Sequence, residues 1–213
     1  MDTELLVTSW QTRLVAMIDD RPFRFLDTTR RDAERYLAER KTFCGFSEEE
    51  IAAAEGRLGG EFPRVFRTYL RRMGRAPGEL FCGSDLAGVA DLEEFRAVAL
   101  ELFRGSDVTT SLPTRAAVFL LHQGYSLAYV VADGSEDGPV FTYAEGESAP
   151  RVGATTFAAF VDAELTACEE GHRELRAAGG YYLRVEGSGG AMHFPARASG
   201  ERPLDGPDRF ASE

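Results

Sequence analysis

Residues 43–73 carry start and stop signals for two consecutive helices, and these signals constrain the fold more than any other part of the sequence. Ser47 followed by Glu50 is a capping-box pattern, in which the hydroxyl and the carboxylate each bind a backbone N–H at the start of a helix. Gly59-Gly60 supplies a left-handed ending. The apolar residues that share one face are Ile51, Ala54 and Leu58. The sequence therefore predicts a helix that starts at Ser47 and ends at Gly59.

A second helix is expected directly after the first. Pro63 suits its first turn, where the missing N–H of proline costs nothing, and Gly74 closes it. The apolar residues that recur at helical spacing are Phe62, Phe66, Tyr69, Leu70 and Met73. This aromatic-rich face predicts a helix that packs into the core.

The segment before residue 43 predicts two helices and an extended stretch. Apolar residues at helical spacing favour an amphipathic helix over residues 6–18, ending near Asp19-Asp20. Residues 21–26 are expected to be extended, and Thr28 to open a short charged helix through Arg40.

The middle of the chain predicts an antiparallel sheet. Residues 116–121 and 126–131 are rich in β-branched and aromatic side chains and are joined through Gly124, which is typical of a hairpin. Residues 140–143 predict a third strand, and Thr155 or Thr156 is expected to start a helix that continues to about Cys168. Upstream of the sheet, a short strand is expected over residues 79–83 and a helix capped by Asp91.

The C-terminal part predicts a small hairpin followed by an irregular tail. Residues 181–185 and 191–194 flank the glycine-rich segment 187–190. The remainder, through Pro203 and Pro207, is polar and is expected to be irregular.

The order of these elements resembles the SUKH superfamily, which includes the Smi/Knr-type fungal regulators. The resemblance rests on the Gly45-Phe-Ser-Glu-Glu-Glu-Ile51 helix start, Leu58-Gly59, the Phe62-Pro63 pair and the aromatic-rich helix, followed by the hairpin, acidic turn, strand and closing helix. It spans residues 43–170, and Arg72-Met73-Gly74 departs from the Asn-Gly that members often carry after this helix. Most bacterial members are immunity proteins that neutralise a toxin encoded beside them, so the resemblance implies that function here.

The expected fold class is α+β, with a SUKH-like antiparallel or mixed sheet packed by helices. We expect an N-terminal helical extension over residues 1–42, the SUKH-like domain over 43–170, and a C-terminal hairpin and irregular tail over 171–213.

The chain is acidic, with a formal net charge of −11 over 213 residues. Such a charge disfavours direct binding to nucleic acid, which depends on Lys and Arg neutralising phosphates, and favours a basic protein partner. Only Lys41 among the 24 basic residues is a lysine, which indicates a GC-rich bacterial genome. No apolar stretch reaches the roughly 20 residues needed to cross a bilayer, and no signal peptide is recognisable, so we expect a cytoplasmic protein with no membrane partner.

No metal or cofactor site is predicted. His122, His172 and His193 are far apart and outside any metal motif, and the odd set of Cys44, Cys82 and Cys168 is typical of small buried hydrophobic residues in a reducing cytoplasm. Residues 133–138 begin like a calcium loop, but Ala144 stands where a bidentate Glu belongs, so a hairpin turn is favoured.

No catalytic residues are predicted either. Ser126 in Gly124-Tyr-Ser-Leu-Ala128 has the spacing of a nucleophile elbow, but it is followed by a strand where that motif needs a helix. Gly187-Ser-Gly-Gly190 lacks the Lys and Ser/Thr of a phosphate loop. We therefore do not expect an enzyme.

An acidic surface remains as the candidate binding site. No Lys or Arg occurs between Arg115 and Arg151, whereas two turns there are rich in carboxylates. If both turns lie at the same end of the sheet, they form one patch for a basic partner, with tyrosines as anchors. The residues of this candidate partner-binding site are Asp133, Glu136, Asp137, Glu145, Glu147, Tyr125, Tyr129 and Tyr143. Solvated turns with no binding role are the alternative.

The preferred interpretation is an immunity protein that binds and neutralises a cognate, basic toxin, such as a nuclease. A regulatory or scaffold adaptor of Smi/Knr type is the alternative, and a small-molecule binder or enzyme with a pocket near His122 or His193 is a third. The sequence leaves the toxin, the oligomeric state and the role of the extensions open.

Overall fold

The chain folds into two units, each of which joins segments far apart in the sequence. A computed structural model describes residues 2–105, 111–185, 191–195, 204 and 206–211. Unit 1 contains Met1–Trp10 and Phe43–Glu164, and unit 2 contains Gln11–Thr42 and Leu165–Glu213. The division falls inside helices α1 (Thr3–Asp19) and α6 (Phe157–Ala177), so each helix contributes residues to both units.

Unit 1 is built on a five-stranded sheet in the order β2-β3-β4-β5-β6, and every neighbouring pair is antiparallel. Besides parts of α1 and α6, its elements are α3 (Glu48–Leu58), α4 (Arg64–Met73), β2 (Asp85–Leu86), α5 (Leu92–Arg104), β3 (Ala116–His122), β4 (Ser126–Val131), β5 (Val140–Ala144) and β6 (Arg151–Ala154). The predicted hairpin and third strand are confirmed. The strand predicted over residues 79–83 is wrong, because that segment forms turns and the strand lies at residues 85–86. The sequence-based prediction missed β6.

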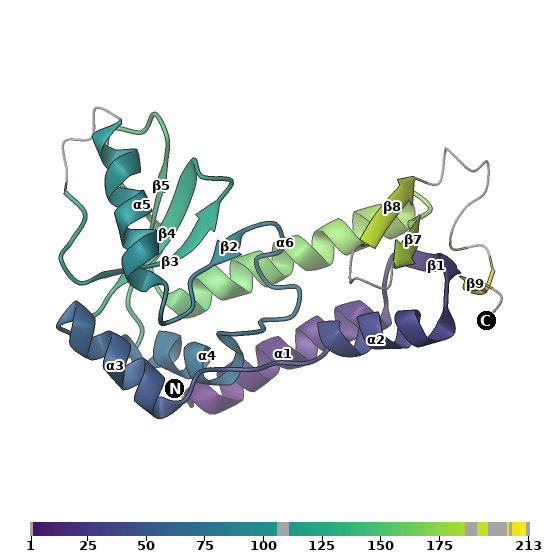
Figure 1. Ribbon diagram of the computed structural model, residues 1–213, viewed down its shortest axis with the longest axis horizontal. Coiled ribbons are helices and arrows are strands. Elements are labelled where there is room, and N and C mark those ends of the chain that lie inside the picture. Colours follow the sequence, from purple (N-terminus) through teal and green to yellow (C-terminus); the bar gives the residue numbers. More distant parts are fainter. Residues whose placement is uncertain (1, 106–110, 186–190, 196–203, 205, 212–213) are drawn as a thin grey trace. The chain divides into compact units, whose positions relative to one another are not determined.

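Helices cover both faces of this sheet. Side chains alternate between the two faces along each strand, and those of β3 and β4 are buried on both faces. Phe119 of β3 packs against Phe66 of α4 and Phe157 of α6, with ring centroids 5.4 and 5.6 Å apart. The opposite face is covered by α5, which Figure 1 shows beside β4 and β5. The buried residues of that second layer are Ala99, Phe103, Leu112, Ala116, Val118, Leu121, Leu127, Tyr129 and Tyr143.

The predicted ends of α3 are confirmed. The Ser47 hydroxyl accepts a hydrogen bond from the Glu50 N–H at 3.3 Å, and the Glu50 carboxylate accepts one from the Ser47 N–H at 2.8 Å. Gly59 ends the helix with a φ of 73°, a left-handed conformation that favours glycine. Pro63 stands at the N-cap of α4, as its missing N–H allows.

The turn between β4 and β5 caps the start of α4. The N–H of Arg64 donates to the carbonyl of Ser135 at 2.9 Å, and the N–H of Val65 donates to the carbonyl of Glu136 at 3.1 Å. The first N–H groups of a helix have no partner within the helix, so these two carbonyls satisfy donors that α4 cannot.

The same turn caps α6. The Asp137 carboxylate accepts hydrogen bonds from the N–H of Phe157 at 2.8 Å and of Ala158 at 3.4 Å. Burial raises the pKa of Asp137, and these two backbone N–H groups oppose the rise. One turn of the sheet thus fixes the starts of both helices on one of its faces.

Unit 2 has a mixed sheet in the order β8-β7-β1-β9. Besides parts of α1 and α6, its elements are β1 (Phe23–Thr28), α2 (Arg30–Arg40), β7 (Tyr181–Val185), β8 (Ala191–Pro195) and β9 (Arg209–Phe210). The predicted hairpin of β7 and β8 is confirmed, although its connection over residues 186–190 lies outside the described residues. Part of the tail expected to be irregular forms β9, which pairs with β1.

Parallel pairing of β1 with β7 joins the two ends of the chain in unit 2. Phe23 lies opposite Tyr181, and Phe25 lies opposite Leu183. Helix α2 starts one residue later than predicted, with Thr29 as its N-cap. The core of this unit consists of Phe23, Phe25, Ala33, Tyr36, Leu183 and Val185. The α+β class expected from the sequence is therefore confirmed, with helices packed on an antiparallel and a mixed sheet.

The cap of α6 gives a first prediction. We expect Asp137→Ala to lower the free energy of unfolding by about 1 kcal/mol, because two backbone N–H groups lose their acceptor. Asp137→Asn keeps an acceptor oxygen and should stay close to the parent at neutral pH. Chemical denaturation of the three proteins measures both effects.

The pH dependence of the same variants tests the electrostatic part. A carboxyl whose folded pKa is raised makes stability fall as the pH rises from its unfolded to its folded pKa, because the folded state holds the proton more tightly. Asp137→Asn removes that decline in the mildly acidic range. Equal slopes for the parent and Asp137→Asn would contradict this role of burial.

Candidate partner-binding surface

The two acidic turns lie at opposite ends of the sheet. Strand β5 separates them, and its antiparallel register places Ala144 opposite Ser126 and Phe141 opposite Tyr129. The β4–β5 turn therefore lies at one end, and the β5–β6 turn lies with the β3–β4 turn at the other. The condition for a single acidic patch is not met, and the candidate residues form two separate groups.

Carboxylates at the β4–β5 end are largely engaged in the fold. Asp133 accepts a hydrogen bond from the N–H of Ser135 at 3.0 Å, and hydrogen bonding by Ser135 lowers the pKa of Asp133. Glu136 pairs with Arg64 at 3.1 Å, and Asp137 caps α6. A salt bridge this exposed contributes little, but it neutralises part of the charge. This end offers a weaker acidic field than its composition suggests.

The opposite end combines an exposed aromatic residue with carboxylates. Tyr125 is 43% exposed, and its carbonyl accepts a hydrogen bond from the Glu145 N–H at 2.7 Å. Glu147 accepts a hydrogen bond from the Ala144 N–H at 2.9 Å and pairs with Arg151 at 3.3 Å. We call the group of Tyr125, Glu145 and Glu147 the Tyr125 end of the sheet.

The other two candidate tyrosines belong to the core. Tyr129 and Tyr143 are only 3% and 1% exposed, beneath α5. The Tyr129 ring stacks on Phe141 with centroids 5.1 Å apart, and burial raises the pKa of Tyr129. Neither side chain can contact a partner while the sheet keeps this packing.

A groove between β2 and α5 continues the Tyr125 end. The Ser84 hydroxyl lies 3.0 Å from Nδ1 of His122, and the His122 ring stands perpendicular to Tyr125 with centroids 5.7 Å apart. The groove has a volume of about 530 Å³, which is in the size class of small binding clefts. Its lining is Ser84, Asp85, Leu86, Glu94, Phe95, Val98 and Leu121.

Sequence reasoning missed Asp85 and Glu94 in this groove. A two-residue strand such as β2 has no periodicity to reveal it, and the predicted strand was placed several residues too early. Glu94 was visible only as an ordinary acidic residue in the first turn of α5. Asp91 is the N-cap residue of α5, as predicted, but its side chain makes no cap hydrogen bond and instead accepts one from the Gly88 N–H at 3.1 Å.

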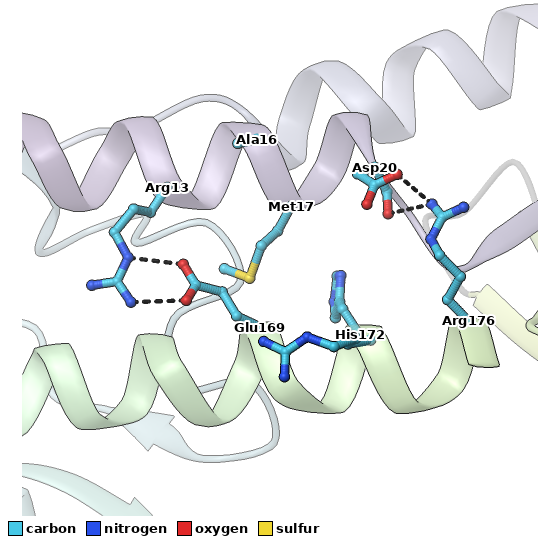
Figure 2. Close-up of a pocket in the computed structure, with 8 residues that line it drawn as sticks. Arg13, Ala16, Met17, Asp20, Glu169, His172 and Arg176 are labelled. Carbon is cyan, nitrogen blue, oxygen red and sulfur yellow. Dashed lines mark hydrogen bonds and ion pairs between the residues drawn. The ribbon is translucent and has the colours of Figure 1, made fainter. Parts of the chain in front are cut away.

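A second cavity, of about 440 Å³, lies in unit 2 between α1 and α6. Figure 2 shows an ion pair at each end of it, Arg13 with Glu169 and Asp20 with Arg176, and Met17 and His172 between them. Arg13 donates to both oxygens of Glu169, at 2.8 and 3.0 Å. Arg176 donates to the Asp20 carboxylate at 2.6 Å. In both ion pairs, a charged side chain of α1 or of the residue after it is neutralised by one of α6.

The remaining chemistry-bearing groups form no further site in the described part of the chain. Among those residues, no group of three or more His, Cys, Asp and Glu side chains could hold a metal ion. None of the described helices is both long and apolar enough to cross a membrane. No disulfide joins the three cysteines, and the expectation that they are buried is wrong for Cys44 and Cys82, which are exposed.

The Arg13–Glu169 pair gives a second prediction. Hydrogen bonding by Arg13 lowers the pKa of Glu169, so the stabilisation is present above the ordinary pKa of a glutamate and is lost as the pH falls through the lowered value. We expect Glu169→Gln to lower the free energy of unfolding by about 0.2–1 kcal/mol at pH 7, the range for partly exposed pairs, and by less near pH 3, where more of the carboxylate is protonated.

Glu170→Gln is the matched control, since Glu170 is an exposed neighbour on the same helix. Denaturation at both pH values compares the two variants. An equal loss in both would show that the bidentate pair is not responsible.

Comparison with known proteins identifies the family. The family model described as SMI1 / KNR4 family (SUKH-1) matches residues 45–163, which is more than half of the chain. The comparison with curated proteins finds no match. The matched range starts just before the capping box of α3 and ends within α6, so it includes the whole five-stranded sheet. The family includes toxin immunity proteins, and its members are generally binding proteins and not enzymes. The chain belongs to the SMI1 / KNR4 (SUKH-1) family.

Proposed function

We propose that the chain is an immunity protein that binds one cognate toxin stoichiometrically and neutralises it in the cytoplasm. The observation that carries the proposal is membership of a family that includes toxin immunity proteins. A net charge of −11 supports a basic partner, because opposite charge accelerates encounter and disfavours wrong partners.

We place the contact surface at the Tyr125 end. Desolvated aromatic side chains often dominate binding energy, and Tyr125 is the candidate tyrosine that is exposed. Glu145 is exposed beside it. Val152 of the edge strand β6 is 57% exposed and adds apolar area on the strand that follows the β5–β6 turn.

The β4–β5 end is the less suitable surface. Asp137 is committed to the cap of α6, and reversing its charge would damage the fold before it tested binding. Asp133 is exposed, its hydrogen bond lies within its own turn and its interaction with Arg115 is purely electrostatic, so changing it should disturb the fold less than changing Asp137. Asp133 and Glu136 therefore serve as a second, separate acidic surface against which the Tyr125 end is compared.

A nuclease is the kind of toxin that fits these charges best. Enzymes that grip a phosphate backbone carry clusters of Lys and Arg, and an acidic inhibitor that covers such a cluster blocks substrate electrostatically and sterically. The immunity protein itself would then have no contact with nucleic acid.

The third prediction tests function and surface together. Affinity purification of the tagged chain at low salt, followed by mass spectrometry, should recover one stoichiometric partner with a toxin domain. Calorimetric titration with that purified domain should then show that Tyr125→Ala and Glu145→Lys each weaken binding by at least about tenfold, or ~1.4 kcal/mol.

Asp133→Lys is the control, because it makes the same change in charge at the other end of the sheet. We expect it to weaken binding less than about threefold and to leave the salt dependence steeper than in Glu145→Lys. A larger effect at Asp133 would move the surface to the β4–β5 end. Recovery of several unrelated partners, none of them a toxin, would contradict the immunity function.

A further inference from the structure

The groove between β2 and α5 has an apolar floor and an acidic rim. Phe95 and Val98 of α5 and Leu121 of β3 provide the apolar side, and Asp85 and Glu94 provide two carboxylates. Asp85 pairs with Leu121 in the sheet register, so its strand borders the groove along one side, and β2 is the edge strand of the sheet. No Lys or Arg lines the groove.

An arginine of α5 and an arginine that pairs with the residue before Glu94 are both engaged elsewhere. Arg96 of α5 donates to the carbonyl of Pro113 at 2.7 Å. Arg57 donates to the carbonyl of Val89 at 2.7 Å and pairs with Glu93, the neighbour of Glu94. Among the described residues, no hydrogen bond or ion pair is formed by the carboxylate of Asp85 or Glu94, and both residues are exposed to solvent.

We propose that this groove receives an arginine side chain of the protein partner. The inference rests on the proposed function and adds the chemistry of one anchoring contact to it. An arginine can lay its methylene stem on Phe95, Val98 and Leu121 while its guanidinium meets the carboxylates of the rim. Its positive charge is also complementary to the two exposed carboxylates of the rim.

The position of the groove supports this occupant. Ser84 borders Asp85 and contacts His122, which in turn contacts Tyr125. The groove is therefore continuous with the Tyr125 end, so one basic partner can cover both. Arginine fits better than lysine, because its planar guanidinium can bind a carboxylate through two hydrogen bonds and can also lie against the Phe95 ring.

A peptide titration tests the groove without any knowledge of the toxin. The probe is acetyl-Gly-Arg-Gly-amide, and its control carries citrulline, which has the shape of arginine without the charge. We expect the arginine peptide to cause saturable amide shifts in ¹⁵N-labelled protein around Asp85, Glu94 and Leu121, with a millimolar dissociation constant. The citrulline peptide should cause none.

The double variant Asp85→Asn/Glu94→Gln should abolish those shifts, because it removes both charges and keeps the side-chain shapes. Its own amide spectrum shows whether the fold is retained. Glu34→Gln/Glu170→Gln is the matched control, with the same change in net charge at two exposed positions of unit 2. Shifts of equal size with citrulline, or no shift at the groove, would overturn the proposal.

The toxin domain, once purified, separates this inference from the proposed function. The groove variant should bind it at least about tenfold more weakly, whereas the control pair should bind it like the parent. Toxin binding that is insensitive to the groove variant would overturn the arginine contact and leave the immunity function standing. Specific peptide binding in a protein that has no toxin partner would support the groove and contradict the immunity function.

Discussion

The connection between β4 and β5 is the contact on which the rest of unit 1 depends. Its carbonyls accept the first N–H groups of α4, and its Asp137 carboxylate accepts those of α6. The backbone there is close-packed: a Cβ on Gly60 would lie 2.2 Å from the carbonyl oxygen of Ala132, so glycine is required. Because α4 and α6 carry Phe66 and Phe157 onto the sheet, a shift of this turn would misplace the aromatic core.

Because the β4–β5 turn holds α4 and α6 in place, its acidic residues serve the fold. The most acidic turn in the sequence uses its carboxylates for a helix cap, a turn and an ion pair, whereas the less conspicuous β5–β6 turn leaves Glu145 beside an exposed tyrosine. A carboxylate that already accepts backbone hydrogen bonds loses them if a partner takes its place. Acidic composition therefore does not identify a binding surface until each carboxylate has been assigned its contacts.

The sequence predicted those features that are encoded locally. The Ser47–Glu50 capping box, the Gly59 ending and the central hairpin depend on residues within a few positions of one another, and all three are confirmed. The parallel pairing of Phe23 with Tyr181 joins segments more than 150 residues apart, and no local sequence pattern predicts such a pairing. The separation of the two acidic turns was accessible in principle, since two turns joined by one antiparallel strand must lie at its opposite ends.

The groove differs from the paired charges of unit 2 in the contacts of its carboxylates. In unit 2 the bidentate Arg13–Glu169 pair and the Asp20–Arg176 pair neutralise their charges at the two ends of the cavity. Asp85 and Glu94 lie against apolar side chains without such partners in the described structure. Both residues are exposed, so their carboxylates keep their hydration until a partner covers the groove, and a guanidinium then supplies the opposite charge. A basic partner that covers the groove gains an apolar contact and an opposite charge at the same place, which the paired charges of unit 2 do not offer.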